Sequence, residues 1–218
     1  MAAIGMYLGQ LLKFIYDFVG NYGVAIIIFT ILIRIVLLPF YVQQMGTMKK
    51  MKEINPLVED LKKKYAKDPQ KLNEEMMKLY KEKNVNPMSG CLPMLLPLII
   101  LWPLFAMLRN YPAFSTASFL WLKSLAEKDP YFILPILSGV TTYISSAMIQ
   151  TDNSQKSMNL IMSAFMIWIT VSLPAGVGIY WVTSNIFQIA QQYFFLRPTE
   201  SMKGESSNEG NNKNRKNS

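Results

Sequence analysis

The chain has 218 residues, of which 51% are hydrophobic and 17% are charged, and its formal net charge is +8. Roughly a quarter of the residues are charged in soluble domains, so this composition favours a membrane protein over an ordinary soluble one. The sequence has no histidine and one cysteine, which excludes a His/Cys zinc site, an internal disulfide and a histidine-dependent catalytic triad.

The first 22 residues have apolar positions that recur with helical spacing, but they also contain Lys13 and Asp17. This pattern predicts an amphipathic helix over residues 1–22 that lies in the membrane interface. The alternative is that the segment forms the first part of a spanning helix. The segment lacks the basic start and the small-residue cleavage site of a secretory signal peptide.

Residues 24–42 are the first segment that is long and apolar enough to span a bilayer, whose core needs about 20 such residues. Arg34 lies inside this segment, roughly 16 Å from its outer end at 1.5 Å per residue. Burying an arginine at that depth costs at least ~2.5–3.5 kcal/mol on insertion scales. The alternative, in which the side chain reaches back to an interface, fits a shallower position better.

Residues 43–87 differ from their neighbours because they carry eleven lysines and seven acidic residues. The pairs Asn55-Pro56 and Asp68-Pro69 each place a capping side chain before a proline, which predicts the start of a helix. We therefore expect a two-helix hairpin outside the membrane. Its helices are expected at about 56–66 and 69–84. The apolar stripes of both helices are thin, so the hairpin should pack weakly and move.

Four further apolar segments follow the hairpin, separated by polar connectors and a tight turn. Together with the first segment they predict five spans, at about 24–42, 92–108, 131–149, 158–172 and 177–195. The tail over 198–218 is rich in Asn, Ser, Lys and Glu and is expected to be disordered. The predicted fold is an all-α polytopic membrane protein with an interfacial helix (1–22), a five-helix core that includes the hairpin (23–197) and a tail.

The distribution of basic residues predicts the orientation of the spans, because cytoplasmic loops are enriched in Lys and Arg. If the hairpin is cytoplasmic, the inside holds its eleven lysines, Lys156, Arg197 and the four basic residues of the tail, which makes seventeen. The outside then holds four, which are Lys13, Arg109, Lys123 and Lys128. We therefore expect the N-terminus outside and the C-terminus in the cytoplasm.

Every acidic residue lies outside the five expected spans, so Arg34 has no fixed counter-ion at its depth in the bilayer. The expected surrounding of this cation is a hydrated cavity lined by polar side chains, in which its charge would attract an acidic visitor. The candidate lining residues are Thr30, Thr142, Ser145, Ser146, Thr183, Gln188 and Gln191. The alternative for the hydroxyl side chains is that they tie neighbouring helices together.

Several motifs, taken in order, resemble those of the YidC family of membrane protein insertases. They are Gly23-Val24-Ala25-Ile26-Ile27 with Thr30, Arg34 and Leu38-Pro39; Met76-Met77-Lys78-Leu79-Tyr80-Lys81; Asn86-Pro87-Met88-Ser89-Gly90-Cys91-Leu92-Pro93; and Leu173-Pro174-Ala175-Gly176 with Tyr180-Trp181, Ser184-Asn185 and Gln191-Gln192. No single motif is specific, but their order and spacing together are. The resemblance extends from Phe14 to about Arg197.

The resemblance implies an insertase of the bacterial cytoplasmic membrane that is not an enzyme and needs no cofactor. It implies that Arg34 lies in a hydrophilic groove, open to the cytoplasm and to lipid but closed on the outer side, and that residues 55–84 are a cytoplasmic hairpin. The implied partners are nascent membrane proteins, the Sec translocon, the lipid bilayer and the ribosome, the last through the hairpin or tail. Recognition of a nucleic acid sequence is not expected.

We expect this protein to have neither the lipoprotein signal of many Gram-positive relatives nor the extra span and periplasmic domain of Gram-negative ones. Its short form resembles the Gram-positive type.

Two other functions also fit the residues. One is a small anion channel or transporter that uses Arg34 as a binding charge. The other is a chaperone that folds membrane proteins without inserting them.

Overall fold

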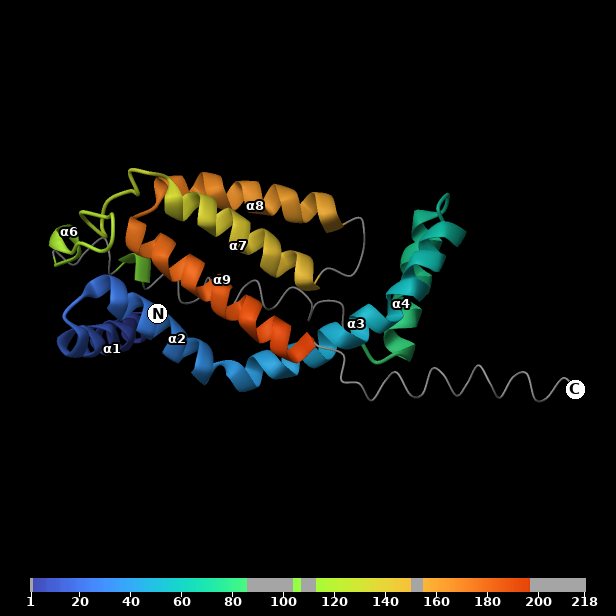
Figure 1. The fold of residues 1–218 in the computed structure, drawn as a ribbon. Helices are drawn as coiled ribbons and strands as arrows, with labels where there is room; N and C mark the ends of the chain where they lie inside the picture. The colour runs from blue at the N-terminus through green and yellow to red at the C-terminus, as the bar shows by residue number, and fades with distance from the viewer. Residues whose placement is uncertain (1, 86–103, 107–112, 150–154, 197–218) are drawn as a thin grey trace, which may run out of the picture.

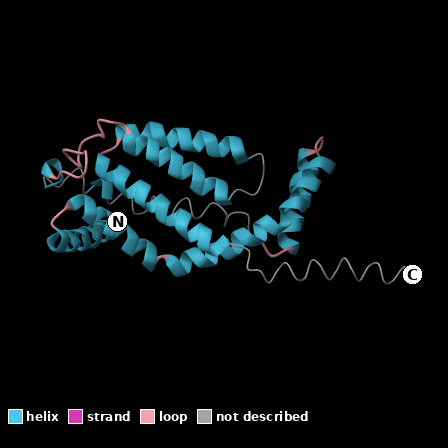
Figure 2. Cartoon of the chain, in the orientation of Figure 1, coloured by secondary structure: helices cyan, strands magenta, loops and turns pink. Residues whose placement is uncertain are grey.

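A computed structural model describes residues 2–85, 104–106, 113–149 and 155–196 (Figure 1). The helices are α1 (Ala2–Val19), α2 (Tyr22–Val36), α3 (Leu38–Lys64), α4 (Pro69–Glu82), α6 (Ala113–Thr116), α7 (Ile133–Ile149), α8 (Gln155–Ser172) and α9 (Ala175–Leu196). Residues 104–106 are also helical, and Figure 2 shows that the other described residues are loops and turns, with an isolated bridge between Phe119 and Leu122. The all-α prediction is confirmed for this part of the chain.

The turn between α1 and α2 depends on two residues with special backbone roles. Gly20 has a φ of +71°, which glycine adopts without the steric penalty of a Cβ. Asn21 then caps α2, because its side-chain oxygen accepts hydrogen bonds from the N–H groups of Gly23 (2.9 Å) and Val24 (3.2 Å). The two helices pack against each other as a result.

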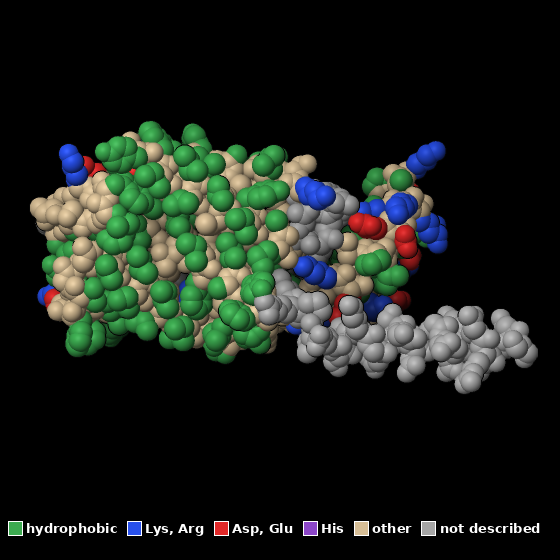
Figure 3. Space-filling model, in the orientation of Figure 1, with side chains coloured by type: hydrophobic (Ala, Val, Ile, Leu, Met, Phe, Trp, Pro, Cys, Tyr) green, Lys and Arg blue, Asp and Glu red, His purple; other side chains and the backbone are tan. Residues whose placement is uncertain are grey.

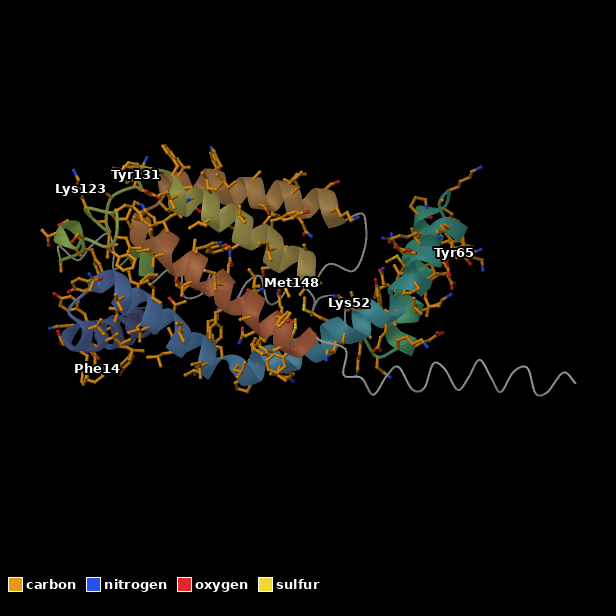
Figure 4. The ribbon with its side chains drawn as sticks, viewed as in Figure 1. Phe14, Lys52, Tyr65, Lys123, Tyr131 and Met148 are labelled. Atoms are coloured by element: carbon orange, nitrogen blue, oxygen red, sulfur yellow. The ribbon has the colours of Figure 1, made fainter. Side chains whose placement is uncertain are left out.

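Helix α1 has apolar residues on two sides. Leu12 and Ile15 are buried in the core, whereas Tyr7, Phe14 and Phe18 are exposed. Figure 4 shows Phe14 on the outer side of the helix. The exposed residues recur at helical spacing, so they form a second apolar stripe that nothing in the described part of the chain covers.

The first expected span, 24–42, is divided by a sharp bend. Helix α2 ends at Val36, α3 begins at Leu38, and the two axes differ by 61°. Pro39 lies in the first turn of α3, where its missing N–H costs no helical hydrogen bond. Among the described helices none is by itself both long and apolar enough to cross a bilayer, whereas this bent pair meets both conditions together.

The first helix of the hairpin is an extension of α3. This helix continues through Pro56 to Lys64, so the prediction that a helix begins at Pro56 was wrong. A proline inside a helix removes one backbone hydrogen bond and crowds the preceding turn. Ile54 and Val58, on either side of Pro56, are both buried, and their burial offsets part of that cost.

The second helix of the hairpin begins where the sequence predicts. Pro69 is the first residue of α4, and the Asp68 carboxylate accepts a hydrogen bond from the Lys71 N–H at 3.1 Å. No residue of α4 is buried, and its ion pair between Glu75 and Lys78 (2.7 Å) lies on the surface. Figure 1 shows α4 with the end of α3, well away from the other helices.

Helices α7, α8 and α9 form the most closely packed part of the structure, with α7 in contact with both of the others. Gly139 of α7 lies against α8, where a Cβ would be only 2.3 Å from Ile167 Cγ1. The outward faces of α7 and α8 are apolar and exposed, for example at Val140, Ile161 and Trp168. In Figure 3, hydrophobic side chains cover the body of the protein and charged ones gather toward its two ends.

The connector before α7 folds over one end of the helical body. The buried Asp129 carboxylate accepts hydrogen bonds from Trp121 Nε1 (3.0 Å) and from the N–H groups of Tyr131 (3.1 Å) and Leu134 (2.7 Å). The connector also binds the start of α9, through Ala175 N to Glu127 O (2.7 Å) and Gly176 N to Leu125 O (2.9 Å). Asp129 therefore caps α7 while the connector holds α9.

Three of the expected spans correspond to described helices. The segments 131–149, 158–172 and 177–195 match α7, α8 and α9 to within a few residues. The second expected span, 92–108, lies outside the described residues except for 104–106. The tail over 198–218 lies outside them entirely.

Candidate functional site: a buried arginine between α2 and α9

Arg34 lies in the last turn of α2 and is only 6% exposed. Its Nε and one terminal nitrogen both donate to Ser184 Oγ, at 3.0 and 2.6 Å. The same terminal nitrogen donates to Gln188 Oε1 at 3.4 Å. Ser184 and Gln188 are four residues apart on α9, so they share one face of that helix.

Both partners of Arg34 are neutral, so neither cancels its charge. The position of Arg34 provides part of the compensation, because the free carbonyls at a helix C-terminus carry about half a negative charge. The helix ends there because of the bend at Leu37. The Arg34 cation is therefore surrounded by neutral hydrogen-bonding groups.

A second polar face of α9 points toward α7. Trp181 Nε1 donates to Thr142 Oγ1 at 3.1 Å, and Gln192 Nε2 donates to Ser145 Oγ at 3.3 Å. Between them, the Asn185 carboxamide lies 2.9 Å from the Thr142 hydroxyl. When the carboxamide oxygen faces α7, this oxygen also accepts a hydrogen bond from the Thr142 N–H at 3.3 Å. This seam is a set of hydrogen bonds that joins two helices.

The candidate lining residues are divided between these environments. Gln188 binds Arg34 directly. Thr142 and Ser145 belong to the seam between α7 and α9. Thr30 is buried, and its hydroxyl donates to the Ile26 carbonyl of its own helix at 2.6 Å. The remaining three are Gln191, which is buried, and Ser146 and Thr183, which are half-buried.

The main residue that sequence reasoning missed is Ser184, which makes the shortest contact with Arg34. Its spacing from Gln188 was the available signal, because residues four apart on a helix face the same neighbour. Tyr41 and Gln44 of α3 were also missed, although both are buried close to α9. They were assigned to the end of the span and the start of the hairpin, and only the bend at Leu37 brings them inward.

A lysine connects the hairpin to the helical body. Lys52 Nζ of α3 donates to the Met148 carbonyl near the C-terminus of α7 at 2.8 Å (Figure 4). Partial burial lowers the pKa of Lys52 from its usual value. The cation also interacts favourably with the negative end of the α7 dipole.

Within the described residues, no group of His, Cys, Asp and Glu side chains could hold a metal ion.

Comparison with known proteins decides the family. The family model described as 60Kd inner membrane protein matches residues 14–203. The membrane protein insertase YidC of Caldanaerobacter subterraneus subsp. tengcongensis is 77% identical over 206 residues, which are 94% of this chain and 100% of that protein. The chain belongs to the YidC family of membrane protein insertases. The resemblance inferred from the sequence motifs is thereby confirmed.

Other YidC proteins show the same relationship. The membrane protein insertase YidC of Fusobacterium nucleatum is 42% identical over 203 residues, which are 90% of this chain and 98% of that protein. The structure described as an active YidC insertase crystal structure with the first transmembrane domain resolved matches with a TM-score of 0.76 and 32% identity. That match covers 88% of this chain and 46% of the crystallised one, so the YidC fold extends over most of the present protein.

Proposed function

We propose that this protein inserts nascent membrane proteins into the bacterial cytoplasmic membrane, and that Arg34 attracts acidic segments of the entering chain. The observation that carries the proposal is a buried guanidinium bonded only to the neutral side chains of Ser184 and Gln188, among the residues described. A carboxylate could accept hydrogen bonds from this group, and such charge-assisted bonds are about twice as strong as neutral ones. No covalent step and no cofactor are required.

The proposal includes a route for the substrate. The buried polar side chains of α2 and α9 would shorten the apolar path that a hydrophilic segment must cross. A hydrophobic substrate segment could then leave toward lipid across the exposed apolar faces of α7 and α8. The insertase would act alone or beside the Sec translocon.

The proposed topology has five spans, an outer N-terminus with α1 in the interface, and a cytoplasmic hairpin and tail. The basic residues support this orientation. The hairpin would make the first contact with the substrate or with the ribosome, since no residue of α4 is buried and the hairpin carries eleven lysines. Lys64→Cys and Lys123→Cys, each in a Cys91→Ser background, test the topology by labelling intact cells. Labelling at position 123 alone is expected; labelling at position 64 would refute the orientation.

The decisive experiment for function uses the purified protein in liposomes. A single-span reporter with an acidic translocated tail should be inserted and become protected from protease, whereas protein-free liposomes should not protect it. The same vesicles should show no chloride flux. Flux without insertion would favour the alternative of an anion channel. Crosslinks that form only after full insertion would favour a folding chaperone.

A further inference from the structure

A second cluster of buried polar side chains lies on the hairpin side of Arg34. It consists of Tyr41 and Gln44 on α3 and Gln191 and Gln192 on α9, and each is at most 5% exposed. In the described part of the chain, six of their polar atoms have no hydrogen-bond partner: Tyr41 Oη, both amide atoms of Gln44, both amide atoms of Gln191, and Gln192 Oε1. Buried polar groups are nearly always bonded, so this concentration of unpaired atoms is unusual.

The positions of the four residues bring them to one place. Tyr41 and Gln44 are three residues apart and share a face of α3. The Tyr41 ring lies 6.4 Å from the ring of Phe195, which is one turn beyond Gln191 and Gln192 on α9. The Gln192 side chain lies next to the Tyr41 hydroxyl. Figure 1 shows the end of α9 beside the start of α3.

The bend at Leu37 explains why these groups are buried together. A straight continuation of α2 would carry residues 41 and 44 away from α9, whereas the 61° bend folds the start of α3 across the end of α9. Met45 and Met48 of α3 pack there with Phe195 and Ile149. The polar atoms of the cluster are thus next to apolar side chains.

We propose that this glutamine–tyrosine cluster binds the uncharged peptide backbone of an entering substrate segment. A carboxamide has two N–H donors and a carbonyl acceptor, which is the complement of a peptide group. Backbone groups that are not in a helix have no partners in the bilayer core, so an extended segment needs them from the protein. No carboxylate or cation belongs to the cluster, so it recognises neither charge.

Arg34 and the glutamine–tyrosine cluster then recognise different features of the substrate. Arg34 selects an acidic tail, and the glutamine–tyrosine cluster accepts any tail in an extended conformation. This second inference rests on the proposed insertase function and specifies what that function recognises besides charge. Water is the competing ligand for the same donors and acceptors, and the experiment separates water from a peptide backbone.

The test compares two forms of one single-span substrate with a neutral translocated tail. One form has ordinary peptide bonds, and the other has esters at alternate positions of the tail, which removes N–H donors and weakens carbonyl acceptors. Liposomes containing the full chain should insert the ordinary form roughly fivefold faster, as expected for the loss of one or two net hydrogen bonds. Gln44→Leu and Gln191→Leu should slow the ordinary form to the rate of the ester form and leave the ester form nearly unchanged.

Gln43→Leu is the matched control, because Gln43 is exposed and adjacent to Gln44. Its rates should equal those of the wild type. Equal slowing of both substrate forms in Gln44→Leu and Gln191→Leu would show that the cluster holds only water, and unchanged rates would show that it has no role. Either result would overturn the inference while leaving the insertase function intact. Failure of the wild type to insert either form would overturn both.

Folding provides a separate check. Replacing an unpaired buried carboxamide by an apolar side chain of similar size is expected to be neutral or stabilising. The unfolding midpoints of Gln44→Leu and Gln191→Leu in detergent should therefore equal or exceed that of the wild type. A clear decrease would mean that these glutamines are bonded within the resting protein, and the inference would be wrong.

Discussion

The face of α9 that meets α7 and the face that meets α2 and α3 both carry hydroxyl and carboxamide side chains, but they differ in how completely these groups are bonded. Toward α7, Trp181 and Asn185 bond to Thr142, and the amide nitrogen of Gln192 bonds to Ser145, while the Gln192 oxygen belongs to the unpaired atoms of the other face. Toward α2 and α3, Arg34 has neutral partners, and several amide atoms have no partner within the described ranges.

This difference distinguishes polar residues that stabilise the fold from polar residues that could bind a substrate. A polar group that is fully bonded within the fold has little to gain from a visitor, whereas a buried group with unsatisfied capacity gains a hydrogen bond when one arrives. The polar residues of one helix can therefore stabilise the fold on one side and bind a substrate on the other. Residue type alone does not distinguish the two roles.

The largest expected effect comes from Arg34. Arg34→Ala should reduce insertion of a reporter with an acidic tail by about tenfold or more, the equivalent of a lost hydrogen bond to a charged group at ~1.5–3 kcal/mol. Insertion of the same reporter with a neutral or basic tail should change little. Arg34→Lys should retain much of the activity because it keeps a point charge, and Arg34→Glu should be the most harmful for acidic tails.

The measurement is insertion normalised to the amount of folded insertase for the acidic, neutral and basic tails. Equal defects for the three tails would refute the electrostatic role of Arg34. A lower yield of folded protein, with equal activity per molecule, would make Arg34 structural.

The seam between α7 and α9 should respond in the opposite way. Asn185→Leu removes the central amide of the seam and leaves Trp181 Nε1 and the Thr142 hydroxyl with fewer partners. We expect a loss of about 1–3 kcal/mol in stability and equal losses of insertion for all three tails. Thermal unfolding in detergent measures the first effect. Ile186→Leu, at the exposed neighbouring position, is the control, and a tail-dependent defect in Asn185→Leu would place this residue in the groove instead.

Alanine substitutions at two glycines test how tightly the α7–α8 contact is packed relative to α3. Gly139→Ala places a methyl group against Ile167 and 3.2 Å from the Ser163 carbonyl, so α7 and α8 must shift apart, and overpacking of this kind costs about 1–3 kcal/mol. Gly46→Ala on α3 meets no atom of the described residues within 4 Å and should be neutral or stabilising by about 0.5–1 kcal/mol. Melting temperatures of the two variants test the contrast. Equal melting temperatures would mean that the α7–α8 contact is loose.

The smallest expected effect concerns the Lys52 contact. Lys52→Gln should weaken the bond to the Met148 carbonyl at a cost of about 0.5–1.5 kcal/mol, without changing the fold of the body. Hydrogen exchange should already be faster in residues 56–82 than in α7 and α9, and it should become faster still near the base of the hairpin in this variant. Equal protection of the hairpin and the helical body in the wild type would refute the view of the hairpin as a mobile receiver.

Several features could be read from the sequence because they depend on local chemistry. The Asp68-Pro69 pair predicted the start of α4, and the spacing of apolar residues predicted helices close to α7, α8 and α9. The isolation of Arg34 also followed from the sequence, since every acidic residue lies outside the expected spans. Asn55-Pro56 misled the same reasoning, because a proline within α3 is tolerated where Ile54 and Val58 are buried beside it.

What only the tertiary structure decided is which polar side chains face Arg34 and which join helices. Thr142 and Ser145 resemble groove residues in the sequence, but the approach of α7 to α9 places them opposite partners that bond them. Ser184 and Gln188 face Arg34 instead, and the bend at Leu37 turns Tyr41 and Gln44 toward the same helix. Helical periodicity specifies which residues share a face of a helix. The rotation of each helix and the angle of a bend instead arise from packing between segments that are distant in sequence. This rotation and this angle determine which residues lie opposite that face.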